Sequence, residues 1–391
     1  MLILCTSVAI DFIGYGIIVP LLPFYAQSFG ASPIVISWLL SVFLFMQLFA
    51  PTLWGILSDR FGRRPALLLN IAGTSLSLLW LGLSNSLSML FGARVLAGAS
   101  GSSFVIAQSY IADITEPKNR TRDLGFLQAS SGVGFLIGPA IGGLLVGNDP
   151  SNPNFALPGL FAGGISLVTL SFAFVFLPKL KRNNPIAHQE LKSRKLVRSI
   201  AKVLQRPLIA QLSGIFSLAM FAGMGAQAVL PLWCEHQFDW GPKQFSYLVI
   251  FCGVLGAIVS IGLLKPLTRI LGEPKLLLGG LLIVSVGLIL ISFSTDPPLF
   301  LAGIALAICG QAITKPVITS LFSQLAEPKQ QGKTLGLANS FSGLASFLGT
   351  IWAGFVFQLW GPNSPYLIGS ILILIAAIFS WALGKKFSTL S

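Results

Sequence analysis

The sequence predicts an all-α membrane protein with twelve transmembrane helices in two pseudo-symmetric six-helix bundles. Three observations predict it: the composition, a series of long apolar segments, and an internal repeat. Of the 391 residues, 54% are hydrophobic and only 9% are charged, whereas a soluble domain carries roughly 25% charged residues. A chain this poor in charge cannot cover a surface that faces water, so we expect most of its surface to face lipid.

The apolar segments are each long enough to cross a bilayer, which takes about 20 residues. The first begins almost at Met1, lacks the basic region and cleavage site of a signal peptide, and contains Asp11, so we expect a retained helix. The twelve predicted spans are 3–26, 34–57, 65–84, 88–111, 124–147, 158–178, 207–232, 243–264, 275–293, 298–320, 333–358 and 363–384.

Basic residues gather in alternate loops. They are dense in 58–64, in 112–123 and in the long segment 179–206, whereas the loops of the opposite side carry only Lys243. By the positive-inside rule both termini are expected in the cytoplasm, and we expect residence in the plasma (inner) membrane. The net charge of +13 then follows from topology. We expect a lipid bilayer as its surroundings, with anionic lipid near the basic segment, and no nucleic-acid partner.

The chain also repeats itself. Residues 112–145 pair with residues 323–356 without a gap, at an offset of 211. The pairs include the loop triplet Glu116-Pro117-Lys118 with Glu327-Pro328-Lys329, and the glycines Gly138 and Gly143 with Gly349 and Gly354.

The repeat predicts a bundle over 1–178, a basic cytoplasmic linker over 179–206 and a second bundle over 207–391. Parallel repeats of this kind are one plan of secondary transporters, which bind substrate near the midplane between the repeats. A channel and a membrane-embedded enzyme are the alternatives. The spans contain no cluster of Asp, Glu, His and Cys and no phosphate-binding loop, so we expect no enzyme, no cofactor and no metal site.

The stretch GILSDRFGRR, residues 55–64, places charges between the second and third spans. Glycines there permit a tight turn and a close approach of the helices. The stretch resembles the loop motif G-x-L-x-D-R-x-G-R-[KR] of the major facilitator superfamily. The resemblance implies that the aspartate faces the eleventh helix and pairs with the second arginine and with an aspartate ending the fourth helix, as a cytoplasmic latch. The gate residues carried over are Gly55, Asp59, Arg60, Gly62, Arg63, Arg64 and Asp113.

Other motifs extend the resemblance. RVLAGASG (94–101) is similar to the fourth-helix motif R-x-x-x-G-x-x-G, with Ala97 in place of the usual glutamine. DFIGYGIIVPLLP (11–23) resembles the first-helix signature of twelve-span drug/proton antiporters, which include the tetracycline exporters. The specific motifs all lie in the first half, although the resemblance covers the whole chain.

The stretch GFLIGPAIGG (134–143) matches the fifth-helix motif G-x-x-x-G-P-x-x-G-G of the antiporter branches. Its glycines recur every four residues and let another backbone approach, while proline bends the helix. We expect a flexible, leak-tight contact between the two halves. The residues concerned are Gly134, Gly138, Pro139, Gly142 and Gly143.

Asp11, Arg94 and Lys315 are the ionisable residues that lie well within the predicted spans. A charge there costs at least about 2.5–3.5 kcal/mol, so each is a functional candidate. Burial favours the neutral form of a carboxyl group and a nearby arginine favours the charged form, so Asp11 is predicted to carry the proton and Arg94 to tune it. The alternative is a purely structural Asp11–Arg94 pair. For Lys315, snorkelling to the interface and binding of an anionic substrate group are both open.

The substrate is expected to be a small molecule. Candidate cavity residues are Gln108, Gln128, Gln311, Lys315 and Asn339. Tetracycline exporters carry an aspartate in the third helix where this chain has Ser77. That departure argues against tetracycline as the substrate.

The sequence therefore predicts a monomer that exports a small amphipathic compound in exchange for protons by alternating access. One alternative is a transporter or facilitator of a small metabolite such as a sugar. Another is a non-transporting membrane receptor or scaffold, which would tolerate substitution of Asp11 and Asp59.

Overall fold

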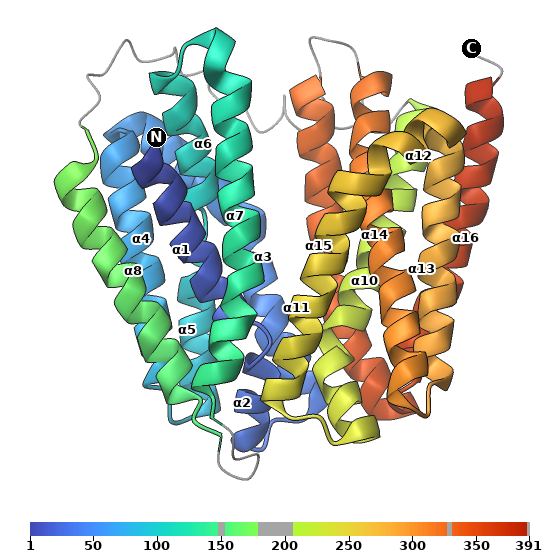
Figure 1. Ribbon diagram of the computed structural model, residues 1–391, viewed down its shortest axis with the longest axis horizontal. Coiled ribbons are helices and arrows are strands. Elements are labelled where there is room, and N and C mark those ends of the chain that lie inside the picture. The colour runs from blue at the N-terminus through green and yellow to red at the C-terminus, as the bar shows by residue number, and fades with distance from the viewer. Residues whose placement is uncertain (148–152, 179–205, 327–330, 389–391) are drawn as a thin grey trace. The chain divides into compact units, whose positions relative to one another are not determined.

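A computed structural model describes residues 1–147, 153–178, 206–326 and 331–388. All regular structure in these ranges is helical (Figure 1). The elements are α1 (Leu2–Ile18), α2 (Leu22–Ser28), α3 (Pro33–Phe61), α4 (Arg63–Gly82), α5 (Leu87–Ser100), α6 (Ser103–Ile114), α7 (Pro117–Leu145), α8 (Ala156–Phe176), α10 (Pro207–Phe238), α11 (Pro242–Ile258), the π-helical η1 (Val259–Leu263), α12 (Leu264–Leu271), α13 (Glu273–Phe293), α14 (Pro297–Leu325), α15 (Gln331–Trp360) and α16 (Ser364–Ser388).

The predicted spans correspond to these helices. Eleven are long and apolar enough to cross a membrane, and α1 with α2 makes a twelfth that is bent by 43°. The all-α, twelve-span fold is thus confirmed.

Three spans differ from the uninterrupted helices that the sequence predicts. The first bends between α1 and α2, the fourth is broken at Gly101 and Ser102 between α5 and α6, and the eighth passes through η1 into α12. A bend or break of the helix that involves one or two residues leaves the mean hydropathy of the apolar segment unchanged. Hydropathy therefore does not predict where it occurs.

The predicted loop 58–64 is also wrong in extent. Helix α3 continues to Phe61 and α4 starts at Arg63, so Gly62 alone separates them. Gly62 has φ +100°, a backbone conformation that glycine adopts without steric cost.

The chain divides into two compact units. Unit 1 comprises residues 1–187 and 239–251, and unit 2 comprises residues 188–238 and 252–391. The first part of α11 therefore belongs to unit 1, although its sequence lies in the second half. The predicted linker 179–206 and the triplet Glu327-Pro328-Lys329 lie outside the described residues, apart from Arg206. The predicted domain boundaries remain a prediction.

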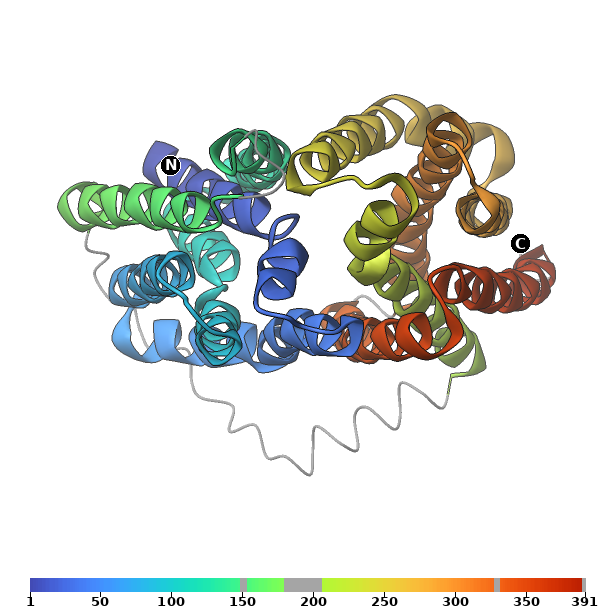
Figure 2. The same cartoon turned by 90° about the horizontal axis from the view of Figure 1, so that it is seen from below.

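Each unit contains the same pair of closely packed helices, α1 with α7 in unit 1 and α10 with α15 in unit 2. A Cβ atom on Gly138 would lie 2.6 Å from the carbonyl oxygen of Ile13, and one on its repeat partner Gly349 would lie 2.2 Å from that of Phe221. Only glycine permits backbones to approach this closely. Figure 2 shows the helices of each unit end-on.

Candidate functional site

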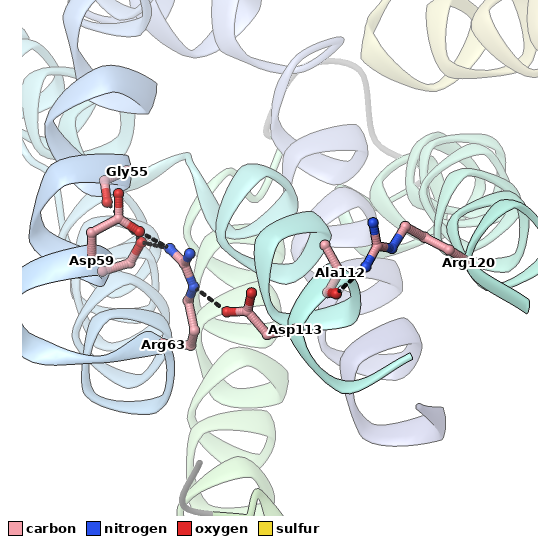
Figure 3. Close-up of polar contacts among 7 residues, drawn as sticks. Gly55, Asp59, Arg63, Ala112, Asp113 and Arg120 are labelled. Carbon is pink, nitrogen blue, oxygen red and sulfur yellow. Dashed lines mark hydrogen bonds and ion pairs between the residues drawn. The ribbon is translucent and has the colours of Figure 1, made fainter. Parts of the chain in front are cut away.

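Arg63 is the shared partner of two aspartates at the junction of α3, α4 and α6 (Figure 3). Its Nη1 lies 2.5 Å from Oδ1 of Asp59, and its Nε donates to Oδ2 of Asp113 at 2.8 Å. Nη1 also donates to the Ser58 hydroxyl at 2.7 Å. The side chain of Arg63 is 17% exposed, against 57% for Asp59 and 46% for Asp113. The cation is thus the more enclosed member of the cluster.

The local fold explains why this cluster needs both acids. Arg63 is the first residue of α4, where the positive end of the helix dipole disfavours a cation. Asp59 lies in the last turn of α3, two residues before its end, and Asp113 is the next-to-last residue of α6. Their two negative charges offset the unfavourable position of Arg63.

The remaining predicted gate residues do not join the cluster. Arg64 donates to the Phe174 carbonyl near the end of α8, and its guanidinium lies 5.8 Å from the Phe174 ring centroid. Arg60 lies over the ring of Phe61. Arg64 thus stabilises the negative end of the α8 dipole. In the first turn of α7, Arg120 donates to the Ala112 carbonyl at 2.8 Å (Figure 3).

Gly55 does not show the close approach that the sequence suggests. A Cβ atom there would meet nothing within 4 Å. Its carbonyl accepts a hydrogen bond from Ser58 at 2.8 Å, which any residue could provide. The structure of unit 1 gives no steric reason for a glycine at this position.

Asp11 and Arg94 do not form the pair that the sequence suggests. Oδ1 of Asp11 is buried without a hydrogen-bond partner, and Ser103, the first residue of α6, lies beside the carboxyl group. Arg94, 4% exposed, lies 4.6 Å from the ring centroid of Phe43 and interacts with Tyr15. No ion pair joins Asp11 to Arg94 in the described part of the chain. The aromatic rings give Arg94 another partner through a cation–π contact.

The break in the fourth span is held by side chains that the sequence analysis did not single out. Gln47 Nε2 donates to the carbonyls of Gly98 at 3.2 Å and Gly101 at 2.9 Å, and Trp54 Nε1 donates to that of Ala99 at 2.6 Å. The Thr74 hydroxyl reaches the Ser100 carbonyl at 3.4 Å. A polar glutamine within an apolar span was the available signal.

Three of the antiporter glycines pack against α1 inside unit 1, and the expected contact between halves remains a prediction. Cβ atoms on Gly134, Gly138 and Gly142 would lie within 2.7 Å of the carbonyl oxygens of residues 9, 13 and 17 of α1. On both helices the contacting residues recur every four positions, so α1 and α7 stay in close contact along the whole stretch. Gly143 alone meets the other half of the sequence, at Ser246 of α11, and Pro139 lies within α7.

The five candidate cavity residues are all exposed. Gln108 is on α6 and Gln128 on α7, in unit 1, whereas Gln311 and Lys315 are on α14 and Asn339 is on α15, in unit 2. Gln311, Lys315 and the exposed Thr319 recur every four residues, so they share one face of α14. Within the described residues Lys315 has no ion-pair partner.

Comparison of the sequence with known proteins identifies its family. The sequence matches the Major Facilitator Superfamily over residues 4–269 and 243–388. The chain belongs to the Major Facilitator Superfamily. It is a membrane transporter, not an enzyme.

Several superfamily members resemble it along almost the whole chain. Multidrug resistance protein 2 of Bacillus subtilis (strain 168) is 27% identical over 96% of this chain and 92% of its own length. The class D tetracycline resistance protein of Salmonella ordonez is 30% identical over 93% and 91%. Among solved structures, the nucleoside transporter NupG superposes with a TM-score of 0.79 at 13% identity, over 98% of both chains. A bacterial homologue of the lysosomal transporter Spinster gives 0.79 at 15%, over 99% and 97%.

Proposed function

We propose that this superfamily member exports small amphipathic compounds in exchange for protons by alternating access. It would act as a monomer in the plasma membrane with both termini in the cytoplasm. Relatives named as multidrug and tetracycline resistance proteins support export of foreign compounds. The basic loops support the orientation.

The observation that carries the proposal is the position of Asp11. It lies inside the first predicted span, 3–26, whereas the other acids in the described helices lie outside the predicted spans. Its Oδ1 is buried and has no hydrogen-bond partner. An acid kept in such a place at a cost of at least about 2.5–3.5 kcal/mol is a candidate proton carrier.

The proton supplies the difference between the two states that a transport cycle requires. A ligand drives a conformational change only if it binds the two conformations differently. When Asp11 is protonated, its carboxyl group is neutral and tolerates enclosure in an apolar site. When it is ionised, it favours the conformation in which water or a donor such as Ser103 reaches it.

The cytoplasmic latch, formed by Asp59, Arg63 and Asp113, is proposed to stabilise one conformation. Its two ion pairs join the ends of α3, α4 and α6. We propose that Asp59 additionally meets the eleventh helix, α15, when the cytoplasmic side is closed. Gly55, Arg60, Gly62 and Arg64 would support the latch through the backbone and through neighbouring helices.

The substrate is proposed to contact the polar side chains that each unit exposes: Gln108, Gln128, Gln311, Lys315 and Asn339. The buried Arg94, with its aromatic neighbours, would act on the charge of Asp11 through space rather than through an ion pair. The glycines of α7 would let α1, which carries Asp11, shift along the stripe formed by Gly134, Gly138 and Gly142.

The first test is proton release from everted vesicles that are acidified inside, on addition of members of a compound panel. We expect some compounds to release protons through the wild-type protein, and Asp11→Asn to abolish release. Asp239→Asn is the matched control, because Asp239 lies in an exposed turn with φ 52°, which asparagine also adopts.

Each other outcome has a defined meaning. Equal release by wild type and Asp11→Asn would place the proton site elsewhere. Transport of a compound without proton release would make the protein a facilitator, and transport of a sugar alone would favour a metabolite carrier. If no compound moves and Asp11 and Asp59 tolerate substitution, the protein is a receptor or scaffold.

A further inference from the structure

We propose that Gln47 and Trp54 are positioning residues for the proton site, because they hold the fourth span broken so that the first turn of α6 meets Asp11. This inference rests on the proposed role of Asp11 as proton carrier. It assigns a function to two side chains of α3 that do not touch Asp11 themselves.

The break requires donors. The last four carbonyls of a helix have no partner within that helix, and inside a bilayer each unsatisfied group costs several kcal/mol. At the end of α5 the carbonyls of Gly98, Ala99 and Gly101 accept hydrogen bonds from side chains of α3, and that of Ser100 accepts one from the backbone N–H of Ser102 at 2.8 Å. Gln47 supplies two of these bonds and Trp54 supplies the shortest, at 2.6 Å. The break is therefore stabilised by the surrounding helices.

The glycines around the break serve these contacts. A Cβ atom on Gly101 would lie 2.4 Å from Nε2 of Gln47, and one on Gly98 would lie 2.6 Å from the Cβ of Met46. Gly101 has φ −77°, which any residue adopts. An alanine at 101 would therefore act by displacing the Gln47 amide, not by straining the backbone.

The break creates a new helix N-terminus beside Asp11. Ser103 is the first residue of α6 and lies beside the Asp11 carboxyl group, and the ring of the next residue, Phe104, lies 6.2 Å from that of Phe12. The N-terminus of a helix carries partial positive charge and favours a nearby carboxylate. Broken helices of transporters use half-helix N-termini in this way toward anionic substrate groups. Here the anion is a side chain of the protein.

One charged side chain approaches the same part of α1. Arg94 of α5 lies beside Tyr15, four residues after Asp11, and makes no ion pair with Asp11 among the described residues. The held break favours ionised Asp11, and a continuous fourth helix would remove this effect.

The test measures protonation of Asp11 directly in the purified full-length protein. Infrared difference spectra recorded along a pH titration show the carboxyl band of Asp11, which is identified by its loss in Asp11→Asn. The variants are Gln47→Met, which keeps the size and removes the donor, Trp54→Phe, and Gly101→Ala. The controls are Gln211→Met, which removes a bond of 2.8 Å to the Phe379 carbonyl in unit 2, and Trp38→Phe, at an exposed position of α3.

We expect the midpoint of the Asp11 band to move to higher pH by about 0.2–0.7 units in each variant and to stay unchanged in both controls. Gly101→Ala added to Gln47→Met should move it little further, because both act on one amide. If a Gln47 variant does not fold, Trp54→Phe decides the question by itself.

Two failures are distinguishable. If the wild-type band titrates and the folded variants leave its midpoint unchanged or lower it, the positioning role is wrong and the proposed function stands. If wild type shows no titrating band that Asp11→Asn removes, Asp11 does not exchange a proton and both proposals fail.

Discussion

Glu273 accepts a hydrogen bond from Gln324 at 3.0 Å, at the place in unit 2 where Arg63 meets Asp113 in unit 1. The repeat offset of 211 pairs Gln324 with Asp113, and it pairs Arg63 with Pro274, one residue after Glu273. Glu273 and Arg63 are each the first residue of a helix that follows a glycine of positive φ, Gly272 and Gly62. Each unit therefore has a polar contact between the first residue of one helix and the end of another, but the residues that make it differ. In unit 2 the acid lies at the helix N-terminus, where the dipole favours it.

Removal of the Glu273 contact in unit 2 is predicted to lower the stability of the protein. Glu273 also accepts from the Ser320 hydroxyl at 2.8 Å, so Glu273→Ala leaves two donors of α14 without their acceptor. We expect unfolding to become easier by about 1–2 kcal/mol, since hydrogen bonds to charged groups contribute about 1.5–3 and partial exposure weakens them. Thermal unfolding in detergent measures this.

The control for this prediction is Glu116→Ala. Glu116 pairs with Lys118 at 2.9 Å, but both side chains are exposed, at 68% and 77%, so we expect little change. Equal losses in the two variants would show that Glu273 has no special role.

Arg63 is predicted to require its guanidinium and not merely its charge. It contacts Asp59 and Asp113 through different nitrogens, and a lysine ammonium on a flexible stem does not reproduce that planar geometry. Arg63→Lys is therefore expected to lower the transport rate several-fold and Arg63→Ala to lower it further, as measured by uptake into everted vesicles.

A cycle tests whether the two acids act through Arg63. Asp59→Asn with Asp113→Asn removes both partners, so adding Arg63→Ala to that pair should cost much less than Arg63→Ala alone. Additive losses would mean that the acids work independently of the arginine.

The span positions could be predicted from the length of the apolar runs. The members of the latch, including Asp113 outside the stretch 55–64, could be predicted from the resemblance to the family. Asp59, Arg63 and Asp113 meet as the resemblance implies, although their role as a gate remains a prediction. The partner of Arg94 could not be predicted, because several side chains of neighbouring helices lie at the same depth and hydropathy does not tell which faces which.

The helix breaks and the Glu273 contact in unit 2 could not be predicted, for a different reason. A bend at 19–21 or a break at Gly101 leaves the average hydropathy of the span unchanged. Glu273 lies just before the predicted ninth span, 275–293, which contains no acid. The glycine at 272 and the polar residues Ser320 and Gln324, four apart on α14, were the available signals.

The stripe of glycines on α7 predicts a position-specific effect of alanine. A Cβ atom on Gly138 would lie 2.6 Å from the Ile13 carbonyl and 2.7 Å from Gly16 Cα, so the backbones must separate. We expect Gly138→Ala to destabilise the protein by about 1–3 kcal/mol. Gly132 lies on the same helix with nothing within 4 Å of its Cβ position, so Gly132→Ala should be neutral or slightly stabilising.

Thermal unfolding of the two variants side by side decides this. If Gly132→Ala is as damaging as Gly138→Ala, the cost comes from the helix in general and not from its contact with α1. Gly349→Ala in unit 2 should behave like Gly138→Ala, because its Cβ would lie 2.2 Å from the Phe221 carbonyl.

Substitution of Lys315 distinguishes the two explanations that its position in the sequence leaves open. A lysine that snorkels to the interface has no preference among substrates, whereas one that faces the substrate attracts anionic groups. Its face of α14 also carries Gln311 and Thr319, which lipid-facing positions would not favour. We therefore expect Lys315→Gln to reduce transport of anionic compounds about tenfold or more, the effect of one lost charge-assisted hydrogen bond. Cationic compounds should be transported at least as well as before, because the repulsion is gone.

The measurement is a competition assay in everted vesicles with pairs of compounds that differ in one carboxyl group. An equal change for both members of each pair would assign Lys315 to the interface.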